Sequence, residues 1–464
     1  MRIALRTILL IAFTLTISGH LPGQLPPAQA EQIDAAVAKA LAASGTPSAS
    51  IAVVMDGQIA YVKAYGNARF DPLTPARSDM RYSIGSVSKQ FLSGAILLLV
   101  QDGKLSLDDR VGRYLPSLTR ANDITIRHLL SHTSGYQDYY PLDYVAPFML
   151  VPVTADGIID RWAKKPLDFE PGTQWQYSNT NFVVAGRILE KVTGAPLWTF
   201  LQSRIFGPLG MHTVINLDAE PLDASDPAGY TRFGLGPARP SRTEAPGWLF
   251  AAGELAMTAR DLALWDQSLI EEKLLTPSSL NDMISPVRLK NGAPVNYALG
   301  VGISNANGHP RLQHGGAVSG FVSNNTVWLD QGAAVVVFTN MDGSDVAASL
   351  ANEIGPLLLA EKQDPQAAQQ LDQARRVLGE LQNGKIDPSV LTSDAIFYFT
   401  PQVLSDAAAS LKPLGAYQKF EQSGWGLRGG MTYRRFSIRF SSGKTLNLTT
   451  FSEADGKFAQ YLIQ

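Results

Sequence analysis

The stretch that best indicates the fold is Tyr82-Ser83-Ile84-Gly85-Ser86-Val87-Ser88-Lys89-Gln90-Phe91, in which a serine and a lysine stand three residues apart. Residues 91–100 are apolar on nearly every side and predict a buried helix that ends at Asp102-Gly103. Residues three apart share one helix face, so Lys89 can reach the Ser86 hydroxyl. A serine hydroxyl needs such a base to act as a nucleophile. Near a helix start, the Ser86 backbone N–H is also free to face an oxyanion.

Two later motifs strengthen this short S-x-x-K pattern, which also occurs at ordinary polar helix starts. Tyr177-Ser178-Asn179 follows the turn at 171–173 and precedes an apolar helical repeat that ends at Gly194. His314-Gly315-Gly316 lies between short runs typical of strands. Taken alone, the tyrosine is explained equally well as a buried hydroxyl with a partner, and the asparagine as a helix cap. Together the three motifs favour a catalytic site.

In this order the motifs resemble those of the serine DD-peptidase, class C β-lactamase and esterase superfamily, which carries S-x-x-K, Y-x-N and then K-T-G or H-x-G. The resemblance covers about residues 31–362 and includes residues 124–135 and Ala252-Gly253. It implies an α/β hydrolase domain of the β-lactamase/transpeptidase type, with an antiparallel sheet flanked by helices, an all-helical subdomain and the site in the crevice between them. It implies no metal or organic cofactor.

The resemblance also implies roles for the motif residues. Ser86 is the nucleophile, Lys89 and Tyr177 share the proton transfer, and Asn179 orients the substrate or Lys89. For Lys89 to act as a base it must be partly neutral, and burial would lower its pKa from the ordinary value of about 10.4.

The third motif separates members of the superfamily. In β-lactamases it begins with a lysine, whose charge helps to hold a carboxylate, followed by a hydroxyl donor. His314 is mostly neutral near pH 7 and Gly315 offers only backbone, which argues against an efficient β-lactamase. Gly315 and Gly316 are expected to contact the substrate. The backbone N–H of Ala317, with that of Ser86, is expected to hold the oxyanion.

The expected function is hydrolysis of an ester or amide through an acyl-enzyme on Ser86. Esters, amides and D-amino-acid peptides, including fragments of peptidoglycan, are the expected substrates, and the motifs leave these classes open. The alternative from another class is a non-catalytic module that binds peptidoglycan or a partner. The intact Ser86, Lys89 and Tyr177 argue against it, because a disused site is free to lose them.

The first 30 residues indicate a secretory signal peptide. Arg2 and Arg6 precede an apolar run at 8–17, and Ala28-Gln29-Ala30 forms an A-x-A cleavage site. The run is short for a bilayer span, so an uncleaved anchor is the weaker interpretation. We therefore expect an exported protein, periplasmic or secreted, with no stable membrane span after cleavage.

The composition fits an exported enzyme held together by its core. The chain has 464 residues, no cysteine and a formal net charge of −2. Loss of residues 1–30 changes this charge to about −4, and neither value suggests a nucleic-acid partner. Without disulfides, stability must come from packing, and the length suggests two to three domains.

The pattern of the first domain, residues 31–362, places strands at its two ends. A surface helix is expected at 32–43, and two strands at 51–55 and 59–65 flank the hairpin turn Asp56-Gly57. Comparable strands return only at 322–329 and 333–339, before a helix at 346–361. Residues 90–290 are helical and loop-rich. One antiparallel sheet built from both ends is therefore predicted.

Residues 363–464 are expected to form a separate small α+β domain. A polar linker helix reaches Leu381, and a second helix spans 402–411. Four strands are predicted at 417–422, 431–440, 445–451 and 458–463. Arg434, Arg435 and Arg439 are interpreted as a solvent-exposed face.

A few other polar residues could take part in chemistry. His128 and His132 stand four apart, as zinc ligands on a helix do, but Leu129 replaces the glutamate of H-E-x-x-H, so a role in satisfying backbone groups is preferred. Glu254 is interpreted as surface charge at a helix start. Weak candidates for the pocket wall are Asp138, Tyr139 and Tyr140.

Overall fold

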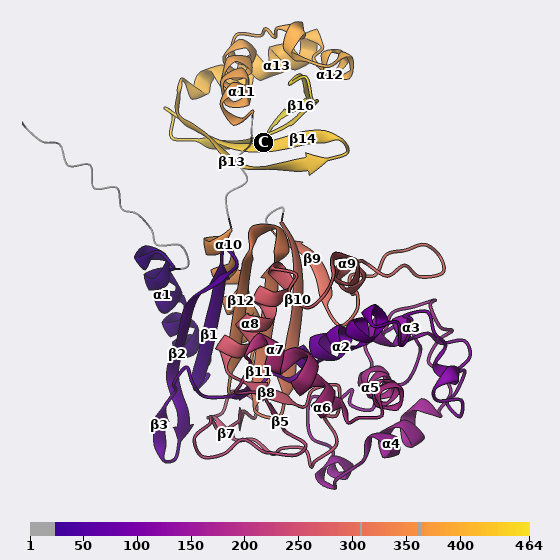
Figure 1. The fold of residues 1–464 in the computed structure, drawn as a ribbon. Helices are drawn as coiled ribbons and strands as arrows, with labels where there is room; N and C mark the ends of the chain where they lie inside the picture. Colours follow the sequence, from indigo (N-terminus) through magenta and orange to yellow (C-terminus); the bar gives the residue numbers. More distant parts are fainter. Residues whose placement is uncertain (1–23, 307–308, 360–363, 365) are drawn as a thin grey trace, which may run out of the picture. The chain divides into compact units, whose positions relative to one another are not determined.

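The computed structural model of the protein describes residues 24–306, 309–359, 364 and 366–464. The chain forms two compact units that divide after Leu359. The larger contains a seven-stranded antiparallel sheet and most of the helices, and the smaller contains a four-stranded antiparallel sheet with helices of its own (Figure 1). The expected fold class is confirmed.

The central sheet joins strands from both ends of the larger unit, in the order β3-β2-β1-β12-β11-β10-β9. The turn Asp56-Gly57 connects β1 and β2 as predicted, and β1 pairs with β12 from Ala49 to Val54. The strands are β1 (Ser48–Met55), β2 (Gln58–Phe70), β3 (Leu73–Pro75), β9 (Gly302–Ala306), β10 (His309–Val318), β11 (Phe321–Trp328) and β12 (Ala333–Thr339).

The expectation that strands return only at residue 322 is wrong, because β9 and β10 precede that residue. His314-Gly315-Gly316, expected between strands, lies within β10. Glycine and proline have low strand propensity, so the local sequence pattern did not predict this strand. In the structure Leu312 of β10 pairs with Ile303 on one side and Val327 on the other. Tertiary pairing therefore makes this segment a strand.

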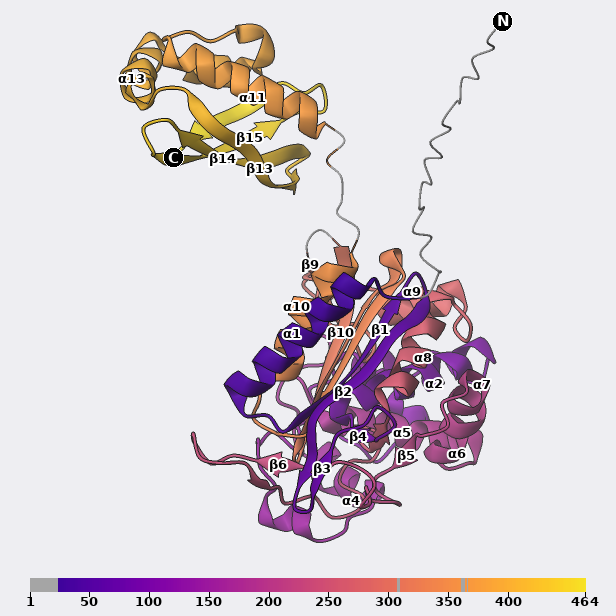
Figure 2. The ribbon, with the colours of Figure 1, turned by 90° about the vertical axis from the view of Figure 1, so that its left-hand side faces the viewer.

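Helices cover both faces of the central sheet. Figure 2 shows α1 (Pro27–Ser44) and α10 (Val346–Leu358) in front of the strands. The opposite face carries α8 (Ala259–Ile270). Side chains of this face, of α8 and of the helical region form one continuous core. One core lies under α1 and α10, with Ile33, Val37, Ile51, Val53, Val335, Val337 and Ile354 among its members, and the other contains Ala52, Val54, Val336 and Phe338.

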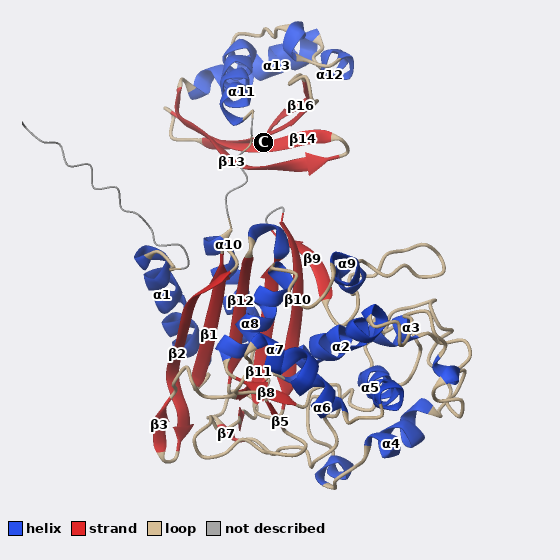
Figure 3. Ribbon diagram, in the orientation of Figure 1, coloured by secondary structure: helices blue, strands red, loops and turns tan. Residues whose placement is uncertain are grey.

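The segment between the two halves of the sheet is mainly helical and loop-rich, as expected (Figure 3). It also contains two small sheets, β4-β8-β5 and β6-β7, that the sequence did not suggest. Its helices are α2 (Lys89–Gln101), α3 (Ile126–Leu130), α4 (Ala155–Ile158), α5 (Asn179–Thr193), α6 (Leu197–Leu201), α7 (Gly207–Leu209) and α9 (Pro277–Ile284). The short strands are β4 (Tyr82–Ser83), β5 (Ile215–Asn216), β6 (Tyr230–Thr231), β7 (Arg239–Pro240) and β8 (Leu255–Met257).

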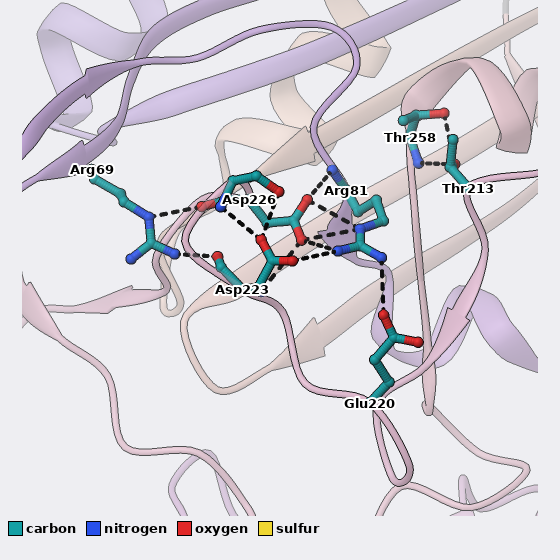
Figure 4. Close-up of polar contacts among 8 residues, drawn as sticks. Arg69, Arg81, Thr213, Glu220, Asp223, Asp226 and Thr258 are labelled. Carbon is teal, nitrogen blue, oxygen red and sulfur yellow. Dashed lines mark hydrogen bonds and ion pairs between the residues drawn. The ribbon is translucent and has the colours of Figure 1, made fainter.

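The loop that follows β5 is anchored by ion pairs (Figure 4). Arg81, just before β4, binds the buried Asp226 carboxylate, with Nε 3.0 Å from Oδ2, and also contacts Glu220 and Asp223. Arg69 of β2 donates from Nε to the Asp226 carbonyl at 2.9 Å. Two arginines thus hold the loop against the sheet next to the serine motif.

The smaller unit has its own core between one sheet face and helices. α11 contributes Ala374, Val377, Leu378 and Leu381 to that core, so its interpretation as a linker helix is wrong. The polar side of α11 dominates its composition, which hid the apolar stripe. The elements are α11 (Ala367–Gln382), α12 (Ser393–Tyr398), α13 (Pro401–Leu411), β13 (Tyr417–Arg428), β14 (Met431–Phe440), β15 (Thr445–Ser452) and β16 (Phe458–Ile463).

The interpretation of three arginines as one solvent face is wrong for Arg434. Alternate residues of a strand face opposite sides, so Arg435 and Arg439 are exposed while Arg434 points into the core. The Arg434 guanidinium binds Asp364 through two hydrogen bonds, of 2.6 Å from Nε and 2.8 Å from Nη2. This buried ion pair ties the start of the smaller unit to its sheet.

Most of the predicted signal segment, residues 1–23, lies outside the described residues. Its last four residues form the first turn of α1, where Gln29 donates a hydrogen bond to the Leu357 carbonyl of α10. The helix thus begins five residues before its predicted start. None of the helices in the described ranges is long and apolar enough to cross a bilayer.

Candidate active site

Ser86 lies on a single 3-10 turn, Gly85–Ser88, that leads directly into α2. Gly85 has a φ of +50°, in the left-handed region that favours glycine. A Cβ at this position would also lie 2.9 Å from the backbone nitrogen of Ala317. Glycine thus lets strand β10 pass against the turn, which brings Ser86 and Ala317, the two expected oxyanion donors, side by side.

Lys89, the first residue of α2, is fully buried and makes three polar contacts. Its Nζ lies 2.9 Å from Ser86 Oγ, 2.8 Å from Asn179 Oδ1 and 2.8 Å from the Ala252 carbonyl oxygen. The amide and carbonyl oxygens can only accept hydrogen bonds. A neutral Lys89 therefore donates both of its protons to them and directs its lone pair at the Ser86 hydroxyl.

Burial of Lys89 favours its neutral form. Its Nζ lies over the rings of Tyr177 and Phe182, 5.0 and 5.4 Å from their centroids, and these ring faces by themselves favour the ammonium. Burial lowers the pKa of Lys89 to about 7, and the Asp138 and Glu254 carboxylates oppose this effect only in part. The amine can therefore exchange a proton near neutral pH, as the sequence-based expectation of a buried lysine base requires.

Asn179 connects Lys89 to a buried carboxylate. It begins α5, and its backbone N–H and Nδ2 donate to Asp138 Oδ1 at 2.9 and 3.2 Å. A carboxylate only accepts, so the amide NH2 faces Asp138 and the amide oxygen faces Lys89. Burial raises the pKa of Asp138, while hydrogen bonds from Tyr140 and Asn179 and the charge of Lys89 oppose the rise. Asp138, a weak pocket candidate in the sequence, orients this side chain.

Tyr177 places its ring against the buried imidazole of His132, with centroids 4.3 Å apart. Its hydroxyl is buried and forms no hydrogen bond of normal geometry with the described residues. Burial raises the pKa of Tyr177, and the neighbouring Ser86 hydroxyl lowers it by a smaller amount. The phenol therefore stays protonated near neutral pH and can donate a proton, whereas the sequence had suggested that it accepts one alongside Lys89.

His314 is held as a neutral imidazole. Its Nδ1 lies 2.6 Å from the Gly315 carbonyl oxygen, which only accepts, so Nδ1 carries the proton. Its Nε2 then accepts from the Tyr297 hydroxyl at 2.8 Å. Burial, followed by the charge of Lys89, lowers the pKa of His314 to about 4. Tyr297, which no motif in the sequence indicated, thus fixes the first residue of the third motif.

The two glycines of the third motif differ in their surroundings. A Cβ on Gly316 would lie 1.9 Å from the Ile84 carbonyl oxygen and 2.4 Å from Ser323 Oγ, so this glycine permits close packing of β10 against the serine turn. A Cβ on Gly315 would meet nothing closer than 3.8 Å. Gly315 is exposed on the side of β10 that carries Ala317.

A cavity of about 1410 Å³ opens at Ser86. Its walls include every residue proposed for the site from the sequence except the buried Lys89, together with the weak candidates from the loop after α3. The lining residues that matter here are Ser86, Asp138, Tyr139, Tyr140, Tyr177, Asn179, Arg232, Arg242, His314, Gly315, Gly316 and Ala317.

A known protein family matches most of this chain. The sequence profile of the family described as Beta-lactamase matches residues 33–357, more than half of the chain. The chain belongs to the Beta-lactamase family. The superfamily resemblance noted in the motifs is thereby confirmed.

Relatives within the Beta-lactamase family include peptidases. A penicillin-binding protein of Bacillus subtilis is 28% identical over 62% of this chain and 66% of its own length. A D-aminopeptidase of Brucella anthropi is 29% identical over 66% of this chain and 59% of its own. The chain thus spans less than two thirds of these two relatives. The crystal structure of D-amino acid amidase from Ochrobactrum anthropi SV3 complexed with L-phenylalanine amide superimposes with a TM-score of 0.62, at 25% identity over 71% of this chain and 98% of that one.

The two histidines of the possible zinc motif each serve the backbone. The helix α3 ends at Leu130, so His128 and His132 do not share a helix face. The His128 imidazole accepts from the Thr125 N–H at 3.3 Å, and that of His132 accepts from the Ser178 N–H at 3.2 Å. Among the described residues no group of three His, Cys, Asp or Glu side chains could hold a metal ion.

The interpretation of Glu254 as surface charge is wrong. Its side chain is buried behind Ala252-Gly253, close enough to Lys89 to affect its pKa. The polar segment after Thr258 suggested an exposed helix start, but Glu254 precedes β8, which is fully buried between β4 and β5. Only the pairing of these short strands reveals its position.

Proposed function

We propose that this member of the Beta-lactamase family is a serine hydrolase that cleaves an amide or ester through an acyl-enzyme on Ser86. The observation that carries the proposal is the position of Lys89. Its buried Nζ lies 2.9 Å from Ser86 Oγ and is held by two other acceptors, its pKa is about 7, and its neutral form would therefore direct its lone pair at the Ser86 hydroxyl. A base with this geometry activates a serine without a histidine or a metal ion.

Acylation then uses groups already in place. Lys89 takes the proton of Ser86, whose Oγ attacks the substrate carbonyl carbon. The backbone N–H groups of Ser86 and Ala317 stabilise the oxyanion that forms. As the tetrahedral intermediate collapses, the leaving amine or alcohol takes a proton from the Tyr177 phenol, and the Lys89 ammonium restores the phenol. The neutral form of the tyrosine suits it to this step.

Deacylation reverses these roles with water as the nucleophile. Neutral Lys89 accepts a proton from the water that attacks the acyl carbonyl, and Ser86 leaves as its oxygen regains a proton from Lys89. The fixed amide of Asn179 keeps Lys89 directed at the serine in both halves of the reaction. One lysine thus acts as base and then as acid in each half.

As substrates we propose amides or short peptides of D-amino acids that carry a free amine. Asp138 lines the cavity and is joined through Asn179 to the catalytic lysine, so it can attract an ammonium group next to the scissile bond. The neutral His314 offers no charge to a carboxylate at that place. The names of the D-aminopeptidase and D-amino acid amidase relatives support the same choice.

The cavity also offers positive charge to a peptide substrate. Arg232 and Arg242 line it and could bind a carboxylate further along the substrate. Peptidoglycan-derived D-peptides carry both groups, and the predicted export signal would place the enzyme with them. We therefore propose a periplasmic or secreted location for the protein.

A substrate panel tests the proposal. D-phenylalanine amide, its L-enantiomer, its N-acetyl derivative, short nitrophenyl esters and nitrocefin are compared with wild type and Ser86→Ala. We expect turnover of the D-amide and of the esters, loss of amide turnover on N-acetylation, and slow or absent nitrocefin hydrolysis. Rapid nitrocefin turnover would contradict the substrate class. Absence of Ser86-dependent turnover and of Ser86 labelling by a fluorophosphonate would favour the non-catalytic binding module instead.

A further inference from the structure

Two acids that the proposed mechanism does not use lie next to the backbone turn that contacts Lys89, the buried Glu254 and the half-buried Asp218. Glu254 immediately precedes β8, and Asp218 follows β5 by two residues. Beyond the paired ends of these strands the Leu217 N–H donates to the Glu254 carbonyl at 2.7 Å, so Asp218 is the residue next to the one opposite Glu254, and its charge helps to raise the pKa of Glu254. Neither residue is part of the cavity wall.

Both carboxyl groups bind the same backbone turn, residues 247–253. Asp218 Oδ1 accepts from the Gly247 N–H at 2.7 Å and also interacts with the Leu249 N–H. The Glu254 carboxylate interacts with the Ala251 N–H and its own N–H. The two acids therefore hold the turn from both ends.

This turn supplies an acceptor to the catalytic lysine. The Ala252 carbonyl receives a hydrogen bond of 2.8 Å from Lys89 Nζ. The preceding residue, Ala251, has a φ of +59°, in the left-handed region that is unfavourable for a residue with a Cβ. Surrounding contacts must hold such a conformation in place. The two carboxyl groups provide such contacts directly at the turn.

Each acid also has one buried oxygen without a partner among the described residues, Oδ2 of Asp218 and Oε2 of Glu254. A buried oxygen without a hydrogen bond is unfavourable, and two adjacent carboxylates repel each other. A proton on Glu254 would remove the repulsion between the two charges. Burial raises the pKa of Glu254 to about 8 and that of Asp218 to about 6, which is consistent with one proton near neutral pH.

We propose that Asp218 and Glu254 are positioning residues: a charged Asp218 and a neutral Glu254 hold the turn 247–253 and so fix the Ala252 carbonyl that orients Lys89. This inference rests on the proposed role of Lys89 as the base. The other charged or titratable groups near the pair are Lys89, Asp138, Tyr139 and Glu244. Loss of the Glu254 proton at high pH would add a negative charge near Lys89 and raise the pKa of Lys89.

The test compares Glu254→Gln, Glu254→Ala and Asp218→Asn with wild type. Glutamine imitates the protonated glutamate, so Glu254→Gln should label Ser86 with a neutral fluorophosphonate as fast as wild type near pH 7. Above about pH 8 wild type should fall below this variant, because only the glutamate ionises. Glu254→Ala leaves the Ala251 N–H without its acceptor, so kcat should fall about tenfold or more with little change in KM. Asp218→Asn should lower kcat in the same way.

Asp266→Asn is the matched control, since Asp266 is buried with a free oxygen but contacts Asn325 and not the turn. It should leave the pH profile unchanged. Folded Glu254→Gln with a wild-type profile above about pH 8 would overturn the proposal, as would Glu254→Ala with wild-type kcat. An infrared spectrum provides a readout independent of activity, because Glu254→Gln should remove a protonated-carboxyl band. If wild type is not labelled at Ser86, the proposed function fails, and this band still decides whether Glu254 is protonated.

Discussion

Replacement of Asp138 by asparagine should shift the pH dependence of Ser86 acylation to lower pH. Lys89 and Asp138 bind opposite ends of the Asn179 amide, with hydrogen bonds of 2.8 and 3.2 Å. Because the amide O and N between them are themselves about 2 Å apart, the two charges are about 6–8 Å apart, which at an effective dielectric constant of about 20 corresponds to about 2–3 kcal/mol. The carboxylate stabilises the ammonium and raises the pKa of Lys89, against burial, which lowers it to about 7.

Asparagine removes this stabilisation and keeps the shape of the side chain. The pKa of Lys89 should fall by about one unit or more, allowing for solvent in the cavity, so a larger fraction of the lysine is neutral at low pH. The measurement is the rate of Ser86 labelling by a neutral fluorophosphonate between about pH 5 and pH 9. The probe is neutral and has no amine for Asp138 to bind, so its rate reports on Lys89 and not on substrate binding.

Asp143→Asn is the control, because Asp143 lines the same cavity and is exposed to solvent. The rise of its labelling rate with pH, the acid limb of the profile, should match that of wild type. An acid limb of Asp138→Asn that stays at the wild-type position or moves to higher pH would refute the reasoning, since removal of a neighbouring negative charge cannot favour an ammonium. Such a result would mean that Asp138 is uncharged or that Lys89 is not the titrating base.

Three further outcomes follow from buried groups. Lys89→Met should abolish labelling of Ser86 yet raise the free energy of unfolding by about 1–3 kcal/mol near pH 7. The folded-state pKa of Lys89 is depressed, so the stability of wild type rises between pH 7 and about 10.5, and the advantage of the variant should vanish at the upper end of that range. Calorimetry at several pH values checks this. Asp364→Ala leaves the Arg434 guanidinium buried and unpaired, so unfolding of the smaller unit should become easier by about 3–5 kcal/mol while labelling persists; unchanged stability would show that water reaches the arginine. Gly316→Ala should lower the melting temperature and the activity, because the new Cβ would lie 1.9 Å from a backbone carbonyl oxygen. Gly315→Ala should keep the melting temperature, because its Cβ would meet nothing closer than 3.8 Å. Equal losses in the two variants would contradict the packing argument.

The order and chemistry of the three motifs were readable from the sequence because they depend on local spacing. Ser86 and Lys89 are neighbours on one turn wherever that turn lies in the fold, and the apolar run behind them predicts burial of α2. The hairpin at Asp56-Gly57 is likewise set by turn chemistry. Both features are present in the structure.

Segments stabilised by distant partners were not readable in the same way. β10 contains glycine, proline and histidine and becomes a strand because β9 and β11 flank it. Arg434 was misassigned because its acidic partner, Asp364, lies 70 residues earlier in the chain. α11 has a polar composition, and its apolar stripe matters only once a sheet packs on it.

The sequence by itself therefore determined which residues carry the chemistry, namely a serine, a lysine, a tyrosine and a histidine at family-like spacing. Only the tertiary structure decided their protonation. The pKa of Lys89 falls to about 7 and that of His314 to about 4 because other parts of the chain bury them. Asp138, Tyr297 and the carboxyl pair reach the site from separate loops and strands. Burial and long-range pairing depend on the whole fold, so no local pattern encodes them.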